Sequence, residues 1–237
     1  PVCSGAAIAA APIYNNEGVV VVTPSATSPA LTEGKNFHFI FRTIGRDDQQ
    51  GPAAAKFIAE KIKPKKVAIL HDKQSYGQGI AASVRDDLKK AGVNVALFEG
   101  INAGDSDYSA VITKLKSAGV DFVYYGGYHP EMGLLLRQAG EQGLKVKLMG
   151  PEGVGNPEIN AIAGPAVEGM LLTLPADFST NPKNAAIVKA FKDKKRDAGG
   201  AFQMTAYAAA QVIIDSIKAV GDNLAKVADH MHKATFE

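Results

Sequence analysis

The sequence predicts an α/β protein built on a parallel β-sheet. In the middle of the chain, short apolar runs alternate with longer segments that carry apolar residues at helical spacing. This alternation is typical of βαβ units. The apolar runs are continuous, as in strands that are buried on both faces. The chain has 237 residues, of which 46% are hydrophobic, so it can form a sizeable core in one or two domains.

The regular series begins at KKVAILHD, where we expect a strand over Lys65–Asp72. A helix should follow from Ser75 to Gly92, because Ile80, Val84 and Leu88 lie on one helical face and glycine ends the segment. The same reasoning assigns the rest of the series in chain order: a strand at 93–100, a helix at 108–118, a strand at 121–127, a helix at 131–142, a strand at 146–153, a short helix at 157–163 and a strand at 168–175.

The segments on either side of this series predict a second, incomplete lobe. A helix at 6–15 and strands at 18–24 and 37–43 precede the series, and helices at 184–195, 202–220 and 223–233 follow it. A doubly wound lobe normally has four or more strands, and only two are evident here. We therefore expect a partial N-terminal lobe from residues 1–46 and 176–237, and a full C-terminal lobe from residues 47–175, with crossings near 45–48 and 174–177.

Composition excludes several classes of function. A net charge of +2 gives no electrostatic case for nucleic acid. No apolar run approaches the roughly 18 residues of a membrane span, so we expect no membrane insertion. The single cysteine, Cys3, cannot form an internal disulfide, so it is either a small buried residue or half of a disulfide whose partner is not in this chain. The opening PVCSGAA has no initiating methionine and no basic leader, which predicts that residues have been removed before it.

Ligands of open parallel sheets bind beyond the carboxyl ends of the strands, and this rule selects candidate residues. After VVVVT come Ser25, Ala26 and Thr27, whose small side chains and hydroxyls allow a ligand to approach the backbone. The same residues could form an ordinary turn that caps the next segment.

Three further candidates follow other strands. Tyr76 stands at a helix start, where it could meet a ligand or pack as an ordinary tyrosine. Tyr128 occupies the loop after FVYYGG, before Pro130 and Glu131 begin a helix. Glu152 in MGPEG is either a surface glutamate or the partner of an ammonium group, because a carboxylate at a strand end needs solvent or a counter-charge.

Catalytic and metal-binding patterns are not evident in the sequence. It contains no GxSxG elbow, no phosphate-binding P-loop and no HExxH motif. His129 is interpreted as a solvated or capping imidazole in preference to a catalytic one. His230 and His232 form HxH near the end of the last helix without a further ligand. We therefore expect no catalytic residue, no metal site and no cofactor.

Several motifs together resemble the periplasmic leucine/isoleucine/valine-binding proteins of ABC transporters. The resemblance runs through the whole chain and is most specific in YYGGYHPEMG and MGPEG. The other matching segments are CSGAA, VVVTPSATSPALT, FRTIGRDDQQGP, LHDKQSYGQG and MGPEGVGN. It implies a type I periplasmic binding protein, with two doubly wound parallel-sheet lobes, a first lobe that is incomplete here and a ligand in the cleft between lobes.

The resemblance also assigns residue roles. It implies that Ser4 and Thr27 bind the carboxylate or ammonium group of an amino acid, together with backbone groups of Ser25. Glu152 would pair with the α-ammonium group, and Tyr76 and Tyr128 would close over the ligand. Ala26 and Phe202 would line the pocket for the hydrophobic side chain.

The function implied is capture of branched-chain amino acids in the periplasm and their delivery to an inner-membrane ABC permease. Such a protein is a monomer and not an enzyme. Family members begin before PVCS, continue past KATFE and carry a cysteine that pairs with the equivalent of Cys3, so the resemblance implies that this chain is a fragment. An amide or urea sensor on the same fold, and an enzyme of flavodoxin-like architecture, are the alternative hypotheses.

Overall fold

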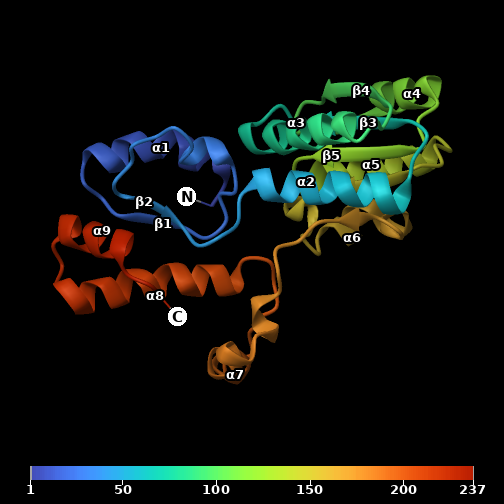
Figure 1. Cartoon of the computed structure of the whole chain (residues 1–237). Helices are drawn as coiled ribbons and strands as arrows, with labels where there is room; N and C mark the ends of the chain where they lie inside the picture. The colour runs from blue at the N-terminus through green and yellow to red at the C-terminus, as the bar shows by residue number, and fades with distance from the viewer. Residues whose placement is uncertain (1, 237) are drawn as a thin grey trace. The chain divides into compact units, whose positions relative to one another are not determined.

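The computed structural model describes residues 2–236, which form two compact units (Figure 1). Unit 2 is the continuous segment Arg46–Leu174. Unit 1 combines the residues up to Gly45 with those from Pro175 onward. Each unit has its own sheet, so the two are described separately.

Unit 2 is built on a five-stranded parallel sheet, as the alternating pattern predicts. The spatial order of its strands is β4-β3-β5-β6-β7, and every neighbouring pair is parallel. The strands are β3 (Val67–His71), β4 (Val95–Gly100), β5 (Phe122–Gly126), β6 (Lys147–Gly150) and β7 (Leu171–Leu172). The chain leaves β3 toward β4 and then returns to β5 on the other side of β3. The switch in strand order therefore lies between β3 and β5.

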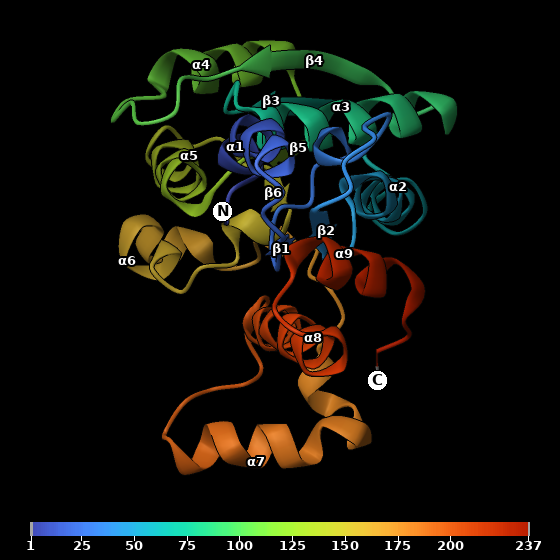
Figure 2. The same cartoon turned by 90° about the vertical axis from the view of Figure 1, so that its left-hand side faces the viewer.

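Helices cover both faces of this sheet (Figure 2). They are α2 (Asp47–Phe57), α3 (Ser75–Lys90), α4 (Ser109–Ala118), α5 (His129–Glu141) and α6 (Ile159–Ala163). Phe122 and Tyr124 of β5 pack in one cluster with α2 and α3, whereas Val123 and Tyr125 pack in the other with α4, α5 and α6. Successive residues of a strand point to opposite faces, so a continuous apolar run supplies both cores.

The helix α2 is not among the predicted elements, because its sequence contains Gly51 and Pro52, a pair that normally indicates a turn. Packing against α3 explains why a helix forms. A Cβ atom at residue 51 would lie 2.3 Å from the Ser83 hydroxyl oxygen, so glycine allows the two helices to approach. The buried residues Ala54 and Ala55 lie on the same face of α2 and pack in one cluster with residues of α3. After α2 the chain continues as a π-helix, η2 (Ile58–Ile62).

Two glycines allow α3 and β5 to pack in close contact at the switch in strand order. A Cβ at Gly77 would lie 2.4 Å from the carbonyl oxygen of Gly126, and a Cβ at Gly126 would lie 2.2 Å from that of Gly77. Asp72 adjoins this contact and is 2% exposed, and its Oδ1 accepts a hydrogen bond from the Gln74 amide at 2.9 Å. Burial raises the pKa of Asp72 to about 6, opposed by the Gln74 amide and assisted by the negative charge of Glu131.

Unit 1 holds two parallel strands, β1 (Val21–Thr23) and β2 (Ile40–Arg42). The helix α1 (Ser4–Asn16) lies on one side of them, and α8 (Gln203–Val220) and α9 (Leu224–Lys233) lie on the other (Figures 1 and 2). The remaining elements of this unit are α7 (Ala185–Asp193) and the 3₁₀ turns η1 (Pro29–Leu31), η5 (Phe178–Thr180) and η6 (Pro182–Asn184). In unit 2, η3 (Glu152–Val154) and η4 (Gly164–Val167) are further 3₁₀ turns. Two strands in the described residues agree with the expectation of an incomplete lobe.

The structure decides between the two interpretations of Cys3 as far as its burial is concerned. Cys3 is exposed and its thiol is free, so its interpretation as a small buried residue is wrong. Its pairing with a cysteine outside this chain stays a prediction. Within residues 2–236, none of the helices combines the length and the apolar character that a bilayer span requires.

We expect Gly77→Ala to destabilise unit 2 by about 1–3 kcal/mol, because the new methyl group meets the Asp72 carboxylate at 2.3 Å and the Gly126 carbonyl. Gly79→Ala is the matched control in the same helix. Its Cβ would meet nothing within 4 Å, and alanine should stabilise α3 by up to ~1 kcal/mol. Urea denaturation of both variants measures the two effects. Equal free energies of unfolding would show that the close contact does not constrain the fold.

We expect Asp72→Asn to become increasingly stable relative to the wild type as the pH rises. The pKa of Asp72 is about 6 in the folded state and about 3.9 in an unfolded chain, so the folded state binds the proton more tightly. The stabilisation that this proton contributes is complete at pH values below the pKa of Asp72 in the unfolded chain. It is lost as the pH rises through the pKa of Asp72 in the folded state. Free energies of unfolding measured from about pH 4 to about pH 7 give the comparison. A constant difference between variant and wild type across that range would contradict it.

Candidate ligand-binding site

Two of the predicted residues meet at the switch in strand order of unit 2. Tyr76 is the second residue of α3, and Tyr128 precedes the first residue of α5 as its N-cap. Their ring centroids lie 5.2 Å apart. Tyr76 is 3% exposed and Tyr128 is half-buried. The close contact of Gly77 with Gly126 brings these two helix starts together and therefore positions both rings.

Glu152 joins this pair from η3, directly after β6. It is only 5% exposed, so its interpretation as a surface glutamate is wrong. The hydroxyl of Tyr76 accepts a hydrogen bond from the Gly153 amide at 3.2 Å. Burial, the charge of Glu152 and a hydrogen bond with its carboxylate are among the causes that raise the pKa of Tyr76 well above its ordinary value. Tyr76 and Glu152 are therefore in direct contact, and the phenol stays protonated.

The first turns of α2 add two residues that the sequence analysis did not select. The side-chain oxygen of Gln50 accepts hydrogen bonds from the Thr173 hydroxyl at 2.6 Å and from the Glu152 amide at 3.3 Å. Asp47, which is 2% exposed, and Glu152 both act through their charge to raise the pKa of Tyr124 and Tyr76, after burial as the main cause. Two buried carboxylates thus face the same tyrosines, and their combined field favours a cation. The sequence signal for these two residues was only their position in the segment after the second strand, which does not identify their distant partners.

The other group of predicted residues forms the loop after β1 in unit 1. The Ser4 hydroxyl, at the start of α1, accepts a hydrogen bond from the Ser28 amide at 3.2 Å. The Ser25 hydroxyl donates to the Val2 carbonyl at 2.8 Å. Ala26 is fully buried and Thr27 is 3% exposed. Ser4, Ser25, Ala26 and Thr27 are therefore brought together, in a loop that also leads into η1.

Two residues that sequence reasoning missed stabilise this loop. The Thr23 hydroxyl accepts from the Ala26 amide at 3.1 Å, which turns the chain at the end of β1. The guanidinium of Arg42, at the end of β2, donates to the Ala26 carbonyl at 2.9 Å and to the Thr32 hydroxyl at 2.8 Å. No motif spacing identifies such contacts, since they depend on the pairing of β1 with β2.

Phe202 lies elsewhere in unit 1, as the half-buried N-cap of α8. Its carbonyl accepts hydrogen bonds from the Thr205 hydroxyl at 3.0 Å and the Ala206 amide at 2.8 Å. Within the described residues, neither a hydrogen bond nor a ring contact joins Phe202 to the loop after β1. Its predicted role in a side-chain pocket stays a prediction.

The histidines have structural contacts. His129 begins α5 and lies 3.3 Å from Glu158. His230 bonds the Ser216 hydroxyl at 3.0 Å, and His232 bonds the His38 carbonyl at 2.9 Å. Across residues 2–236, no group of three or more His, Cys, Asp and Glu side chains could hold a metal ion.

Comparison with known proteins identifies relatives that are named as amino-acid-binding proteins. The leucine-, isoleucine-, valine-, threonine-, and alanine-binding protein of Pseudomonas aeruginosa is 56% identical over 237 residues, which are 100% of this chain and 63% of the relative. The Leu/Ile/Val/Thr-binding protein of Salmonella typhimurium is 48% identical over 235 residues, which are 99% of this chain and 64% of that protein. The chain therefore spans somewhat less than two thirds of the length of these relatives.

Solved structures agree with the sequence relatives. A leucine-binding protein, LivK, of Thermotoga maritima matches with a TM-score of 0.89 and 31% identity, over 98% of this chain and 67% of the other. LivJ of Streptococcus pneumoniae in complex with isoleucine matches with a TM-score of 0.84 and 27% identity, over 98% of this chain and 66% of the other. Residues 1–237 also match the family described as "Periplasmic binding protein". The chain belongs to the periplasmic binding protein family.

Proposed function

We propose that this chain is part of the substrate-binding component of an ABC transporter for branched-chain amino acids. The single observation that carries the proposal is the buried Glu152 beside Tyr76 and Tyr128, at the carboxyl end of the strands of unit 2. The α-ammonium group of an amino acid fits a site with a buried carboxylate, because its opposite charge offsets the cost of that burial. The Pseudomonas and Salmonella relatives are named for binding leucine, isoleucine and valine.

In this proposal unit 2 binds the ammonium group, and Tyr76 and Tyr128 cover the ligand. Unit 1 binds the carboxylate through the hydroxyls of Ser4 and Thr27 and through the backbone at Ser25, where the loop is held in place. Ala26 and Phe202 contact the aliphatic side chain, which gains roughly 0.8 kcal/mol for each CH₂ group that it buries. As in the family, the two lobes close around the ligand. The ligand favours the closed state because that state binds it more tightly than the open one.

The partner in this proposal is an inner-membrane ABC permease, and the compartment is the periplasm. The protein acts as a monomer, binds without chemical conversion and needs no cofactor. Relatives that are named binding proteins support a binding role over an enzymatic one.

The test is a calorimetric titration of the protein, expressed from its complete gene, with leucine, isoleucine and valine. Isovaleramide serves as a neutral amide that keeps the branched chain but lacks the ammonium group. We expect saturable heat with at least one amino acid and none with the amide. Heat with the amide alone would support an amide sensor instead, and no heat or melting shift with any aliphatic amino acid would refute the proposal.

We expect Glu152→Gln to weaken leucine binding about 10- to 100-fold, because a hydrogen bond to a charged group contributes about 1.5–3 kcal/mol. The substitution keeps the shape of the side chain, so the melting temperature of the free protein should change little. Calorimetry measures the affinity and thermal unfolding checks the fold. Unchanged affinity would show that the ammonium group binds elsewhere.

We expect Gln50→Leu to lower both stability and leucine affinity. It leaves the Thr173 hydroxyl and the Glu152 amide without their acceptor, which costs about 1–3 kcal/mol and frees the turn that carries Glu152. Gln49→Leu is the control, since Gln49 is exposed in the same helix. Urea denaturation and leucine titration are compared for the two variants. Equal behaviour would show that Gln50 does not position Glu152.

A further inference from the structure

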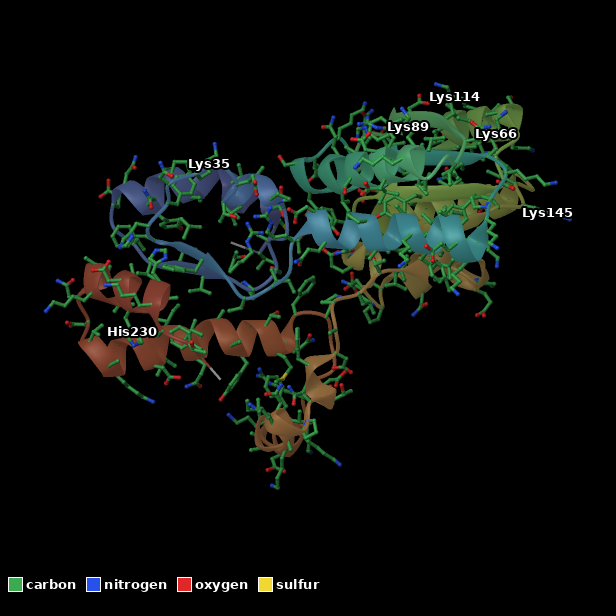
Figure 3. All side chains as sticks on the ribbon, viewed as in Figure 1. Lys35, Lys66, Lys89, Lys114, Lys145 and His230 are labelled. Atoms are coloured by element: carbon green, nitrogen blue, oxygen red, sulfur yellow. The ribbon has the colours of Figure 1, made fainter. Side chains whose placement is uncertain are left out.

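A basic depression lies at the opposite end of the unit 2 sheet, where the strands begin. Its volume is about 530 Å³. Two chain segments border it, residues 61–64 and residues 145–147, together with Asp121 and Phe122 at the start of β5. Lys65 and Lys66 continue the first segment up to β3. We call the lysines of these segments the basic cluster: Lys61, Lys63, Lys65, Lys66, Lys145 and Lys147. Figure 3 shows Lys66 and Lys145 at this same end of the unit.

The lysines of the basic cluster carry charges that ion pairs do not neutralise, and they lie close together in two neighbouring chain segments. Elsewhere lysines form ion pairs, such as Lys90 with Asp87 at 2.7 Å and Lys114 with Glu99 at 2.6 Å. Among the described residues, no ion pair involves any lysine of the basic cluster. All of them are exposed except Lys66, which is half-buried. The overall charge of the chain is only +2, so this end of unit 2 is a local concentration of positive charge.

Asp121, which lines the depression, binds the backbone of the basic cluster and not its side chains. Asp121 accepts hydrogen bonds from the amides of Lys65 and Lys66 at 2.8 and 2.9 Å. Burial opposes its charge, but these two donors and the charge of Lys65 lower its pKa overall. The carboxylate therefore fixes the segment before β3 while the ammonium groups extend into solvent.

The backbone beside the depression is irregular. The π-helix η2 ends at Lys63, which adopts a left-handed conformation with φ of 52°. π-Helical turns are rare and occur frequently at functional sites, and a residue other than glycine in this conformation is uncommon. Lysines at helix ends are often explained by the helix dipole. That explanation accounts for Lys61 and Lys63 at the end of η2, but the other four precede or begin strands.

We propose that the basic cluster is a binding surface for the anionic headgroups of a phospholipid bilayer. Lysine ammonium groups are point charges on flexible stems, and no arginine fork lines the depression that could clasp one phosphate in two-point geometry. A surface of this kind fits many loosely held phosphates. Polybasic segments bind anionic membranes in the same manner. Ile62, Pro64 and Val146 separate the lysines, and their half-buried side chains give the surface an apolar component for the headgroup boundary.

The experiment is co-sedimentation of the protein with vesicles of phosphatidylglycerol and phosphatidylcholine at low salt. The test variant replaces four cluster lysines by glutamine: Lys61→Gln, Lys65→Gln, Lys145→Gln and Lys147→Gln. The control variant removes the same charge from exposed positions of unit 1: Lys35→Gln, Lys183→Gln, Lys192→Gln and Lys194→Gln. Circular dichroism and melting temperatures confirm that both variants fold.

We expect the wild type and the control to bind phosphatidylglycerol vesicles, and the test variant to bind at least tenfold more weakly. Phosphatidylcholine alone should not bind, and high salt should abolish the interaction, because the screening length falls to about 3 Å at 1 M. Absence of wild-type binding, or equal losses in both variants, would overturn the proposal. Saturable binding of soluble polyphosphate without vesicle binding would also overturn it, in favour of a free anion.

Discussion

The candidate site of unit 2 depends on the contact between Gly77 and Gly126. The two backbones approach so closely that a Cβ atom on either glycine would overlap a carbonyl oxygen of the other segment. Because Tyr76 precedes the first glycine and Tyr128 follows the second by two residues, this contact sets the distance between their rings. A side chain at either glycine would push the start of α3 away from β5. The geometry of the site therefore depends on the absence of side chains at Gly77 and Gly126.

Burial of charge is the second physical feature that unites the site. Asp47, Glu152 and Asp72 are all nearly inaccessible to solvent, at the ends of elements that meet at the carboxyl edge of the sheet. A fold driven only by stability would replace such groups with apolar side chains, since burying carboxylates is costly. In the proposed function, an ammonium group bound beside Glu152 offsets part of that cost. The hydrogen bonds of Gln50 with the Glu152 amide and the Thr173 hydroxyl hold in place the turn that carries Glu152.

Much of the fold could be predicted from the sequence, because the strands and helices of unit 2 have clear periodicity. Tyr76, Tyr128 and Glu152 could be selected because they follow strands, although only the structure shows that Glu152 is buried. The helix α2 was missed because Gly51 and Pro52 indicate a turn, and the close packing against Ser83 that favours a helix there is a tertiary effect. Arg42 and Gln50 could not be selected, since their partners lie far away in the chain or depend on strand pairing.

The hydrogen bond between Gln50 and Thr173 also has a consequence for the order of folding. Unit 1 is assembled from both ends of the chain, so its segments must meet across the whole length of unit 2. Closing so long a loop in a disordered chain costs conformational entropy that grows with the logarithm of its length. Unit 2 is a continuous segment and rich in local βαβ contacts, which favours rapid folding. Once it has folded, the 2.6 Å hydrogen bond from the Thr173 hydroxyl to the Gln50 side-chain oxygen holds its first and last segments together. A nascent chain is therefore expected to complete unit 2 first, and the folded unit then serves as a short tether for the assembly of unit 1.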